Sequence, residues 1–278
     1  MKKIIVPIDF SEHSEYALKT AAKLAEKFNA EILALHMLEM SDIMLTASEG
    51  MQHQKTVYFM KLAEQKFEEF LKKDYLANVK VVPIVKHFKV FSEVNDVAIE
   101  KDADLIVMGS HGSSGLKEYF VGSNTERVVR HADIPVLVVK TALSNIHFDV
   151  VAFATDFSEE GIAAYLKAKQ LFDKMKVKMY IVHVNLPGSG FKSSLQIEKS
   201  AVNFFTKTEG NLDKMDDIYY VADFTVEEGL LNSANTIGAD LIAIPTHGRK
   251  GLAHFFEGSI GEDVVINHAT LPVITFKI

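Results

Sequence analysis

Two glycine-containing stretches, Gly109-Ser110-His111-Gly112 and Gly122-Ser123-Asn124-Thr125, decide how this chain is expected to fold. The first follows an apolar run at 104–108 that has the length and branching of a buried strand. The second precedes a helical pattern at 126–131. Glycine lets a backbone approach a ligand closely, and a helix start offers unpaired N–H groups that suit a phosphate. Ordinary turns between a strand and a helix give the same pattern, so both interpretations remain open at this point.

The whole arrangement occurs twice in the sequence. The first strand, at residues 4–8, ends in Asp9-Phe10-Ser11, and Asp156-Phe157-Ser158 repeats that motif at an offset of 147 positions. Thr246-His247-Gly248 and Gly258-Ser259 repeat the glycine stretches at an offset of 136 positions. The 11 residues lost between the two offsets fall in the long second helix and its loops, where deletions are well tolerated. The sequence therefore indicates a duplication with a shortened middle.

Each copy alternates apolar strands with amphipathic helices, which is typical of a parallel sheet covered by helices on both faces. The first helix is expected to be capped by Ser11 and to run to Phe28. In a chain of 278 residues, the repeat predicts two domains of ordinary size, at 1–142 and 145–278. The short polar segment at 140–146 is the expected boundary.

Composition excludes several classes of function. The net charge of −7 disfavours a nucleic-acid partner, and the chain has no cysteine, which removes disulfides and thiol chemistry. The apolar run near the N-terminus is too short for a signal peptide, and no run approaches the ~20 residues that span a bilayer. We therefore expect a cytoplasmic protein with no membrane partner.

The combined pattern resembles the universal stress protein family, whose ATP-binding branch carries the spacing Gly-x-x-Gly-x9-Gly-Ser. The resemblance spans essentially the entire chain, as two tandem copies. It implies two Rossmann-like domains of the adenine nucleotide alpha hydrolase-like type, each an α/β unit with five parallel strands in the order 3-2-1-4-5. It also implies ATP, alone or with Mg²⁺, as the ligand. The two halves are expected to form an intramolecular pseudo-dimer, with a further homodimer as an extension of it.

In that strand order, strands 1 and 4 are neighbours where the order reverses, and ligands bind at the carboxyl ends of strands there. The resemblance implies that Asp9 and the backbone of Pro7 and Ile8 meet the adenine and ribose. Met37 and Met108 would pack against the base. The remaining site residues would pass beneath the ribose or hold the phosphates, and these are Gly109, His111, Gly112, Gly122, Ser123, Asn124 and Thr125.

Most of these residues also have a purely structural interpretation. Asp9 can be a cap or turn residue, Met37 and Met108 can be core, and the histidine of each glycine turn can simply shape that turn. His36 and His183 are expected to be satisfied core or strand-end histidines, because neither pairs with another ligand at metal spacing. We therefore expect no metal site.

The second copy departs from the pattern. Pro245 stands where Gly109 does, which removes a backbone donor, and Ile260-Gly261 replaces Asn124-Thr125. Arg249 and Lys250 bring two cations to the loop in return. We expect a weaker second site, made of Asp156, His247, Gly248, Arg249, Gly258 and Ser259.

The sequence has no Walker-type phosphate loop, no nucleophile elbow and no carboxylate pair for Mg²⁺. No motif in it indicates which residue would act as a general base. No catalytic residue is predicted. The leading hypothesis is a regulatory stress-response protein that binds ATP with little or no turnover. A slow ATPase or nucleotidyl enzyme is the first alternative, by analogy of fold. A structural or apolar-ligand module, in which the glycine stretches are only turns, is the second.

Overall fold

The computed structural model describes residues 1–39, 49–88, 93–111, 122–142, 148–246 and 269–278. Within these residues, no helix has both the length and the apolar character needed to cross a membrane. The predicted glycine stretches therefore fall partly outside the described residues, at 112 in the first copy and from 247 in the second.

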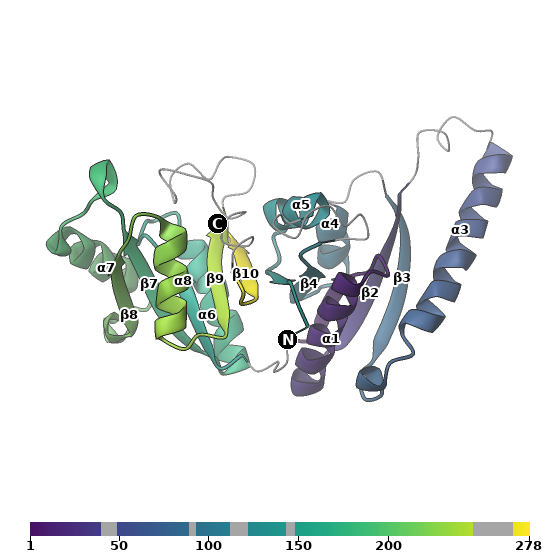
Figure 1. Ribbon diagram of the computed structural model, residues 1–278, viewed down its shortest axis with the longest axis horizontal. Helices are drawn as coiled ribbons and strands as arrows, with labels where there is room; N and C mark the ends of the chain where they lie inside the picture. The colour runs from purple at the N-terminus through teal and green to yellow at the C-terminus, as the bar shows by residue number, and fades with distance from the viewer. Residues whose placement is uncertain (40–48, 89–92, 112–121, 143–147, 247–268) are drawn as a thin grey trace. The chain divides into compact units, whose positions relative to one another are not determined.

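Among the described residues of the first copy, strands alternate with helices as Figure 1 shows. Its strands are β1 (Lys3–Pro7), β2 (Glu31–Glu39), β3 (Val81–Phe88), β4 (Leu105–Gly109) and β5 (Val136–Val139). Its helices are α1 (Glu12–Phe28), α3 (Glu49–Phe70), α4 (Glu93–Glu100) and α5 (Ser123–His131), with a short 3-10 turn, η1, at Asp74–Leu76.

The second copy repeats this series of strands. They are β6 (Val150–Ala154), β7 (Lys178–Asn185), β8 (Ile218–Ala222), β9 (Leu241–Thr246) and β10 (Val273–Lys277). Its described helices are α6 (Ile162–Met175), α7 (Ser194–Thr208) and α8 (Val226–Thr236), with 3-10 turns η2 (Gly188–Gly190) and η3 (Asp213–Asp217). The helix α6 begins directly after Gly161.

The strand order confirms the fold class predicted from the sequence. In the first copy the order is β3-β2-β1-β4-β5, and in the second it is β8-β7-β6-β9-β10, so both copies follow 3-2-1-4-5. The pairs β1–β2, β1–β4, β6–β7 and β6–β9 are all parallel. Right-handed crossovers then place α1 and α3 on one face of the first sheet and α4 and α5 on the other (Figure 1).

Compact packing divides the chain into two units. Unit 1 holds β1 to β4 and the first part of α5, together with the end of β5. Unit 2 holds β6 to β10 with α6 to α8, and Val129–Leu137 packs with it. Each unit has its own core of strand and helix side chains, such as Ile5, Leu18 and Ile106 in unit 1 and Phe153, Tyr165 and Ile242 in unit 2.

Two aspartates fix the starts of the central strands. Asp104 Oδ2 accepts hydrogen bonds from the backbone N–H groups of Lys2, at 2.5 Å, and Lys3, at 3.1 Å. Asp240 repeats this contact in unit 2, where its Oδ2 accepts from the N–H of Asp149 at 2.9 Å. These carboxylates tie the first and fourth strands of each copy together at the amino-terminal end of the sheet.

Candidate functional site

The Asp-Phe-Ser motif forms a tight turn between β1 and α1. Asp9 Oδ1 accepts hydrogen bonds from the N–H of Ser11, at 3.0 Å, and from its hydroxyl, at 2.5 Å. Ser11 caps α1 as predicted, since its side chain accepts from the N–H of Ser14. Phe10 has a φ of 65°, in the left-handed region that costs an L-residue about 1–2 kcal/mol.

Aromatic packing holds Phe10 in this conformation. Its ring centroid lies 4.6 Å from that of His36 and 5.2 Å from that of Phe67. Unit 2 repeats the turn, with Phe157 at a φ of 60° and its ring 5.1 Å from that of His183. The turn is therefore a structural element of both copies, whatever further role its aspartate has.

His36 and His183 lie within β2 and β7 and have the structural role expected from the sequence. Nδ1 of His36 lies 2.7 Å from the carbonyl oxygen of Ile8, and Nδ1 of His183 lies 2.9 Å from that of Thr155. Because a carbonyl only accepts, Nδ1 carries the hydrogen in each ring. Burial lowers the pKa of both imidazoles below the ordinary value, which favours the neutral ring.

Gly109 ends β4 against the first turn of α1. A Cβ atom at this position would lie 2.6 Å from the carbonyl oxygen of His13, a distance that real Cβ atoms do not adopt. The sequence interpretation attributed this glycine to a close approach of ligand and backbone. In the structure, the close approach of helix and strand already requires it.

The start of α5 is tied to the end of β4 by two hydrogen bonds. The N–H of Gly122 donates to the carbonyl oxygen of Ser110 at 2.7 Å, and the hydroxyl of Thr125 donates to that of Gly109 at 2.8 Å. Gly122 and not Ser123 holds the capping position, because the first helical bond runs from the N–H of Glu126 to the carbonyl of Gly122. The N–H groups at 123–125 precede that bond, so the helix itself does not use them.

These segments enclose a pocket at the carboxyl ends of β1 and β4. Its volume is about 70 Å³, whereas sites that enclose a drug-sized ligand measure about 300–1,000 Å³. The described residues could thus hold only part of a nucleotide. The pocket brings together ten of the predicted residues and adds Ser14, and its lining is Pro7, Ile8, Asp9, Ser14, Met108, Gly109, His111, Gly122, Ser123, Asn124 and Thr125.

Two predicted residues of the first copy do not belong to this lining. Met37 lies on β2, half-buried, and is not part of the pocket wall, while Gly112 lies outside the described residues. Sequence reasoning missed Ser14, which is buried and donates its hydroxyl to the carbonyl of Ser11 at 2.9 Å. The signal available for it was its position in the first turn of a helix that follows a strand-end aspartate.

An imidazole pair stands beside the pocket. The ring of His111, which lines the pocket, lies 5.1 Å from the ring of His13 between centroids. Nδ1 of His111 is 2.8 Å from the hydroxyl of Ser110, which is fully buried. Nδ1 of His13 is buried and has no hydrogen-bond partner among the described residues. Sequence reasoning did not single out His13, because only the fold brings α1 against the end of β4.

The predicted second site falls mainly outside the described residues. This applies to His247, Gly248, Arg249, Gly258 and Ser259. Asp156 is described, and its Oδ1 accepts from the N–H of Ser158 at 2.8 Å. Pro245 lies within β9, which is buried along its length, and pairs with Phe276 of β10.

Comparisons with known proteins match both halves of the chain. The sequence profile described as the universal stress protein family matches residues 1–140 and again 147–277. The universal stress protein MJ0531 of Methanocaldococcus jannaschii is 33% identical over 139 residues, which are 50% of this chain and 82% of that protein. The universal stress protein MJ0577 of the same organism is 32% identical over 153 residues, covering 50% of this chain and 94% of that protein.

A solved structure extends the similarity to the entire chain. The crystal structure of a universal stress protein from Archaeoglobus fulgidus DSM 4304 aligns with a TM-score of 0.64 at 22% sequence identity. The alignment covers 99% of this chain and 96% of that one. At this identity the match establishes a shared fold over the length of the chain.

Proposed function

Because the chain belongs to the universal stress protein family in both of its halves, we propose that its first half binds an adenine nucleotide, with ATP as the ligand to be tested. The observation that carries this proposal is the convergence of three separate segments on one pocket. Residues from 7–14, 108–111 and 122–125 line it together, at the point where the strand order reverses. Open α/β sheets bind their ligands at this point.

The phosphates are assigned to the start of α5. No carbonyl group of α5 accepts a hydrogen bond from the backbone N–H groups at 123–125. The positive end of the helix dipole also favours an anion there. Ser123 and Asn124 are exposed and line the pocket, so their side chains can add hydrogen bonds. Thr125 contributes differently, since its hydroxyl donates to Gly109 and positions the helix start.

The nucleoside is assigned to the opposite wall. Asp9 and the backbone of Pro7 and Ile8 line that side, and Met108 supplies apolar surface. The turn uses Asp9 Oδ1 for Ser11, which fixes the carboxylate in place before any ligand arrives. A preorganised acceptor of this kind suits a ribose hydroxyl or a base N–H.

We propose a regulatory protein that binds ATP with little or no turnover and acts in the cytoplasm, where ATP is abundant. Slow hydrolysis is the second candidate, because the imidazole of His111 lines the pocket and could take a proton from water. Pairing of the two halves as a pseudo-dimer stays a prediction, which small-angle X-ray scattering of the full chain can check.

The experiment is a titration of the full chain with ATP by isothermal calorimetry, with and without Mg²⁺. Gly122→Val should remove binding in the first half, because the branched side chain fills the phosphate approach. Gly190→Ala is the matched control, since its new methyl would meet nothing closer than 3.8 Å. Unchanged affinity in a folded Gly122→Val protein would refute the phosphate assignment. Mass spectrometry of small molecules released on denaturation identifies a nucleotide that copurifies.

A further inference from the structure

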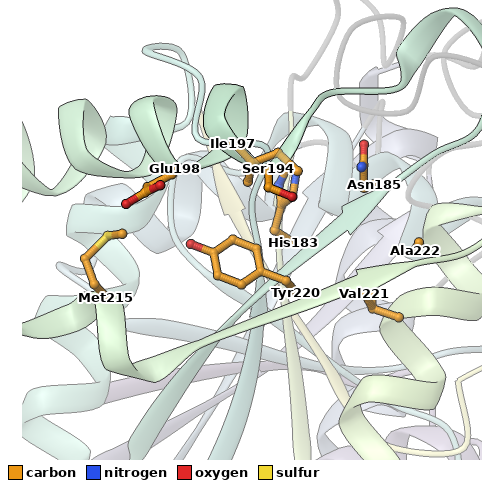
Figure 2. A pocket seen from close by; sticks show the side chains of 9 residues that line it. All are labelled: His183, Asn185, Ser194, Ile197, Glu198, Met215, Tyr220, Val221 and Ala222. Carbon is orange, nitrogen blue, oxygen red and sulfur yellow. The ribbon is translucent and has the colours of Figure 1, made fainter.

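Unit 2 contains a larger pocket that the glycine stretches do not form. It measures about 480 Å³, within the range typical of small-molecule sites. Figure 2 shows its lining, which comes from β7, β8, the first turns of α7 and the 3-10 turn η3. The nine residues are His183, Asn185, Ser194, Ile197, Glu198, Met215, Tyr220, Val221 and Ala222.

The pocket lies away from the strand reversal of its own copy. In unit 2 the order reverses between β6 and β9, whereas the pocket is built over the carboxyl ends of β7 and β8. Asn185 and Ala222 are the last residues of these two strands. The position expected for a second nucleotide, at Asp156 and the glycine stretches, is therefore a different one.

The buried polar side chain in the lining, His183, offers a hydrogen-bond acceptor. His183 is 4% exposed, and its Nδ1–H donates to the carbonyl of Thr155. Burial lowers the pKa of the ring, which favours its neutral form. The hydrogen bond to Thr155 opposes this effect, the nearby Lys192 strengthens it, and Asp156 opposes it. Nε2 of the neutral ring then carries a lone pair, and a ligand that reaches it must donate a hydrogen bond.

The walls and rim favour an aromatic body and disfavour an anion. Ile197, Met215 and the ring of Tyr220 supply apolar surface (Figure 2). Glu198 is the acidic residue of the lining, and among the described residues it has no ion-pair partner. Burial and then the charge of Glu198 raise the pKa of Tyr220, so its hydroxyl stays protonated.

The amide of Asn185 is already engaged. Its side chain donates to the carbonyl of Lys192 at 2.9 Å and accepts from the N–H of the same residue at 3.0 Å. This pair fixes the loop before α7, and the capping box of Ser193 and Gln196 then fixes the helix start. These contacts fix the start of α7, whose first turns form one wall of the pocket.

We propose that this pocket, between β7, β8 and α7, binds a small aromatic amine whose ring N–H donates to Nε2 of His183 and whose cationic end lies near Glu198. Two exposed apolar residues, Phe191 and Leu195, lie within three residues of Ser194 in the sequence, although they are not part of the pocket lining. They are 62% and 60% exposed.

A series of indole compounds tests the proposal directly. The chain contains no tryptophan, so the fluorescence anisotropy of an indole ligand reports its binding without background. Tryptamine should bind the full chain more tightly than tryptophol, and indole-3-propionate should bind most weakly. 1-Methyltryptamine, which lacks the ring N–H, should bind about tenfold more weakly than tryptamine, because it leaves the acceptor of His183 unpaired.

Two variants locate the site. Glu198→Gln should weaken tryptamine about two- to fivefold, as expected for a charge at an exposed rim, and leave tryptophol unchanged. Asp216→Asn is the matched control, because it removes an exposed carboxylate next to Met215 that does not line the pocket. Ser194→Phe should block all of the ligands without disturbing the core, since Ser194 is exposed.

Several outcomes would overturn the proposal. These are no rise in anisotropy with tryptamine, equal binding of the amine and the carboxylate, or binding that survives Ser194→Phe in a folded protein. Displacement of tryptamine by saturating ATP would show that the pocket belongs to a nucleotide site. Loss of ATP binding in Gly122→Val with tryptamine binding intact is the expected pattern, so the two proposals can fail separately.

Discussion

The hydroxyl of Thr125 donates a 2.8 Å hydrogen bond to the carbonyl oxygen of Gly109, and this contact joins the first turn of α5 to the last residue of β4. Both partners are buried. The two residues also belong to the lining of the candidate nucleotide pocket. One side chain thereby sets the distance between the two walls that a phosphate would have to fit.

Thr125→Val should weaken this junction. Valine keeps the shape but leaves the buried carbonyl of Gly109 without this donor, so the free energy of unfolding should fall by about 1–3 kcal/mol. ATP affinity should fall with it, because the helix start is no longer held. Urea unfolding and ATP titration measure the two effects. Thr125→Ser keeps the hydroxyl, so it should lose much less stability and much less ATP affinity. Equal losses in the valine and serine variants would contradict the role of this hydrogen bond.

Gly109→Ala should destabilise the protein by about 1–3 kcal/mol, the usual effect of overpacking. The new methyl group would lie 2.6 Å from the carbonyl of His13, so α1 or β4 has to move. Urea unfolding measures the loss, and Gly190→Ala, whose nearest neighbour would be 3.8 Å away, should be close to neutral. A stability equal to that of the unsubstituted chain would mean that the contact relaxes freely.

The duplication and the alternation of strands with helices followed from the sequence because their signals are local or repeated, whereas the strand order 3-2-1-4-5 and the proposed site came from the family resemblance. Asp9, Ser11 and the glycine stretches lie within a few residues of the elements that they terminate. The contacts of Gly109 with His13 and the entry of Ser14 into the pocket did not follow, because they depend on how α1 packs across β4. The pocket over β7 and β8 carries no motif, since three separated segments supply its walls.

The left-handed phenylalanines offer a test of how the turn is stabilised. Phe157→Ala should lower the free energy of unfolding by about 3–5 kcal/mol, because a buried ring is lost. Phe157→Gly loses the same ring but adopts the φ of 60° without strain, so it should be more stable than the alanine variant by about 1 kcal/mol. Thermal or urea unfolding of the pair measures the difference. Equal stabilities would show that the positive φ carries little strain.

Acid should destabilise the protein partly through His183. Its pKa is lowered in the folded state, so below the ordinary value of about 6.5 the unfolded chain binds the proton more readily. The contribution of His183 is fully present above that value. It is lost as the pH falls toward the folded-state pKa, at up to about 1.4 kcal/mol per pH unit.

His183→Asn should therefore flatten the decline of stability between about pH 7 and pH 5. Urea unfolding at several pH values gives the slope for both proteins. An identical slope in the variant would mean that His183 is not buried as a neutral ring. Burial also lowers the pKa of His36, so the same comparison of pH slopes can be made in unit 1 with His36→Asn.

The two halves should differ in their affinity for ATP. Gly122→Val should remove most of the binding measured at low ATP concentration, whereas Gly258→Val should remove little. The second copy has Pro245 in place of Gly109 and Ile260 behind Ser259, and it loses donors worth about 1.5–3 kcal/mol, or roughly ten- to a hundredfold in affinity. Calorimetry on both variants tests this, and an equal or larger effect of Gly258→Val would reverse the assignment.

The turn at Asp9 and its counterpart at Asp156 bear on how the duplicated gene has diverged. Duplication gives every feature a second copy, on which selection can relax. Both turns retain the left-handed phenylalanine and its neighbouring histidine, whereas the glycine stretches of the two copies now differ. What stayed alike is what each half needs in order to fold. A genome search for nucleotide binders that relied on Asp-Phe-Ser would therefore collect relatives by ancestry. Under the proposed function, the glycine stretch is the better query for the ligand.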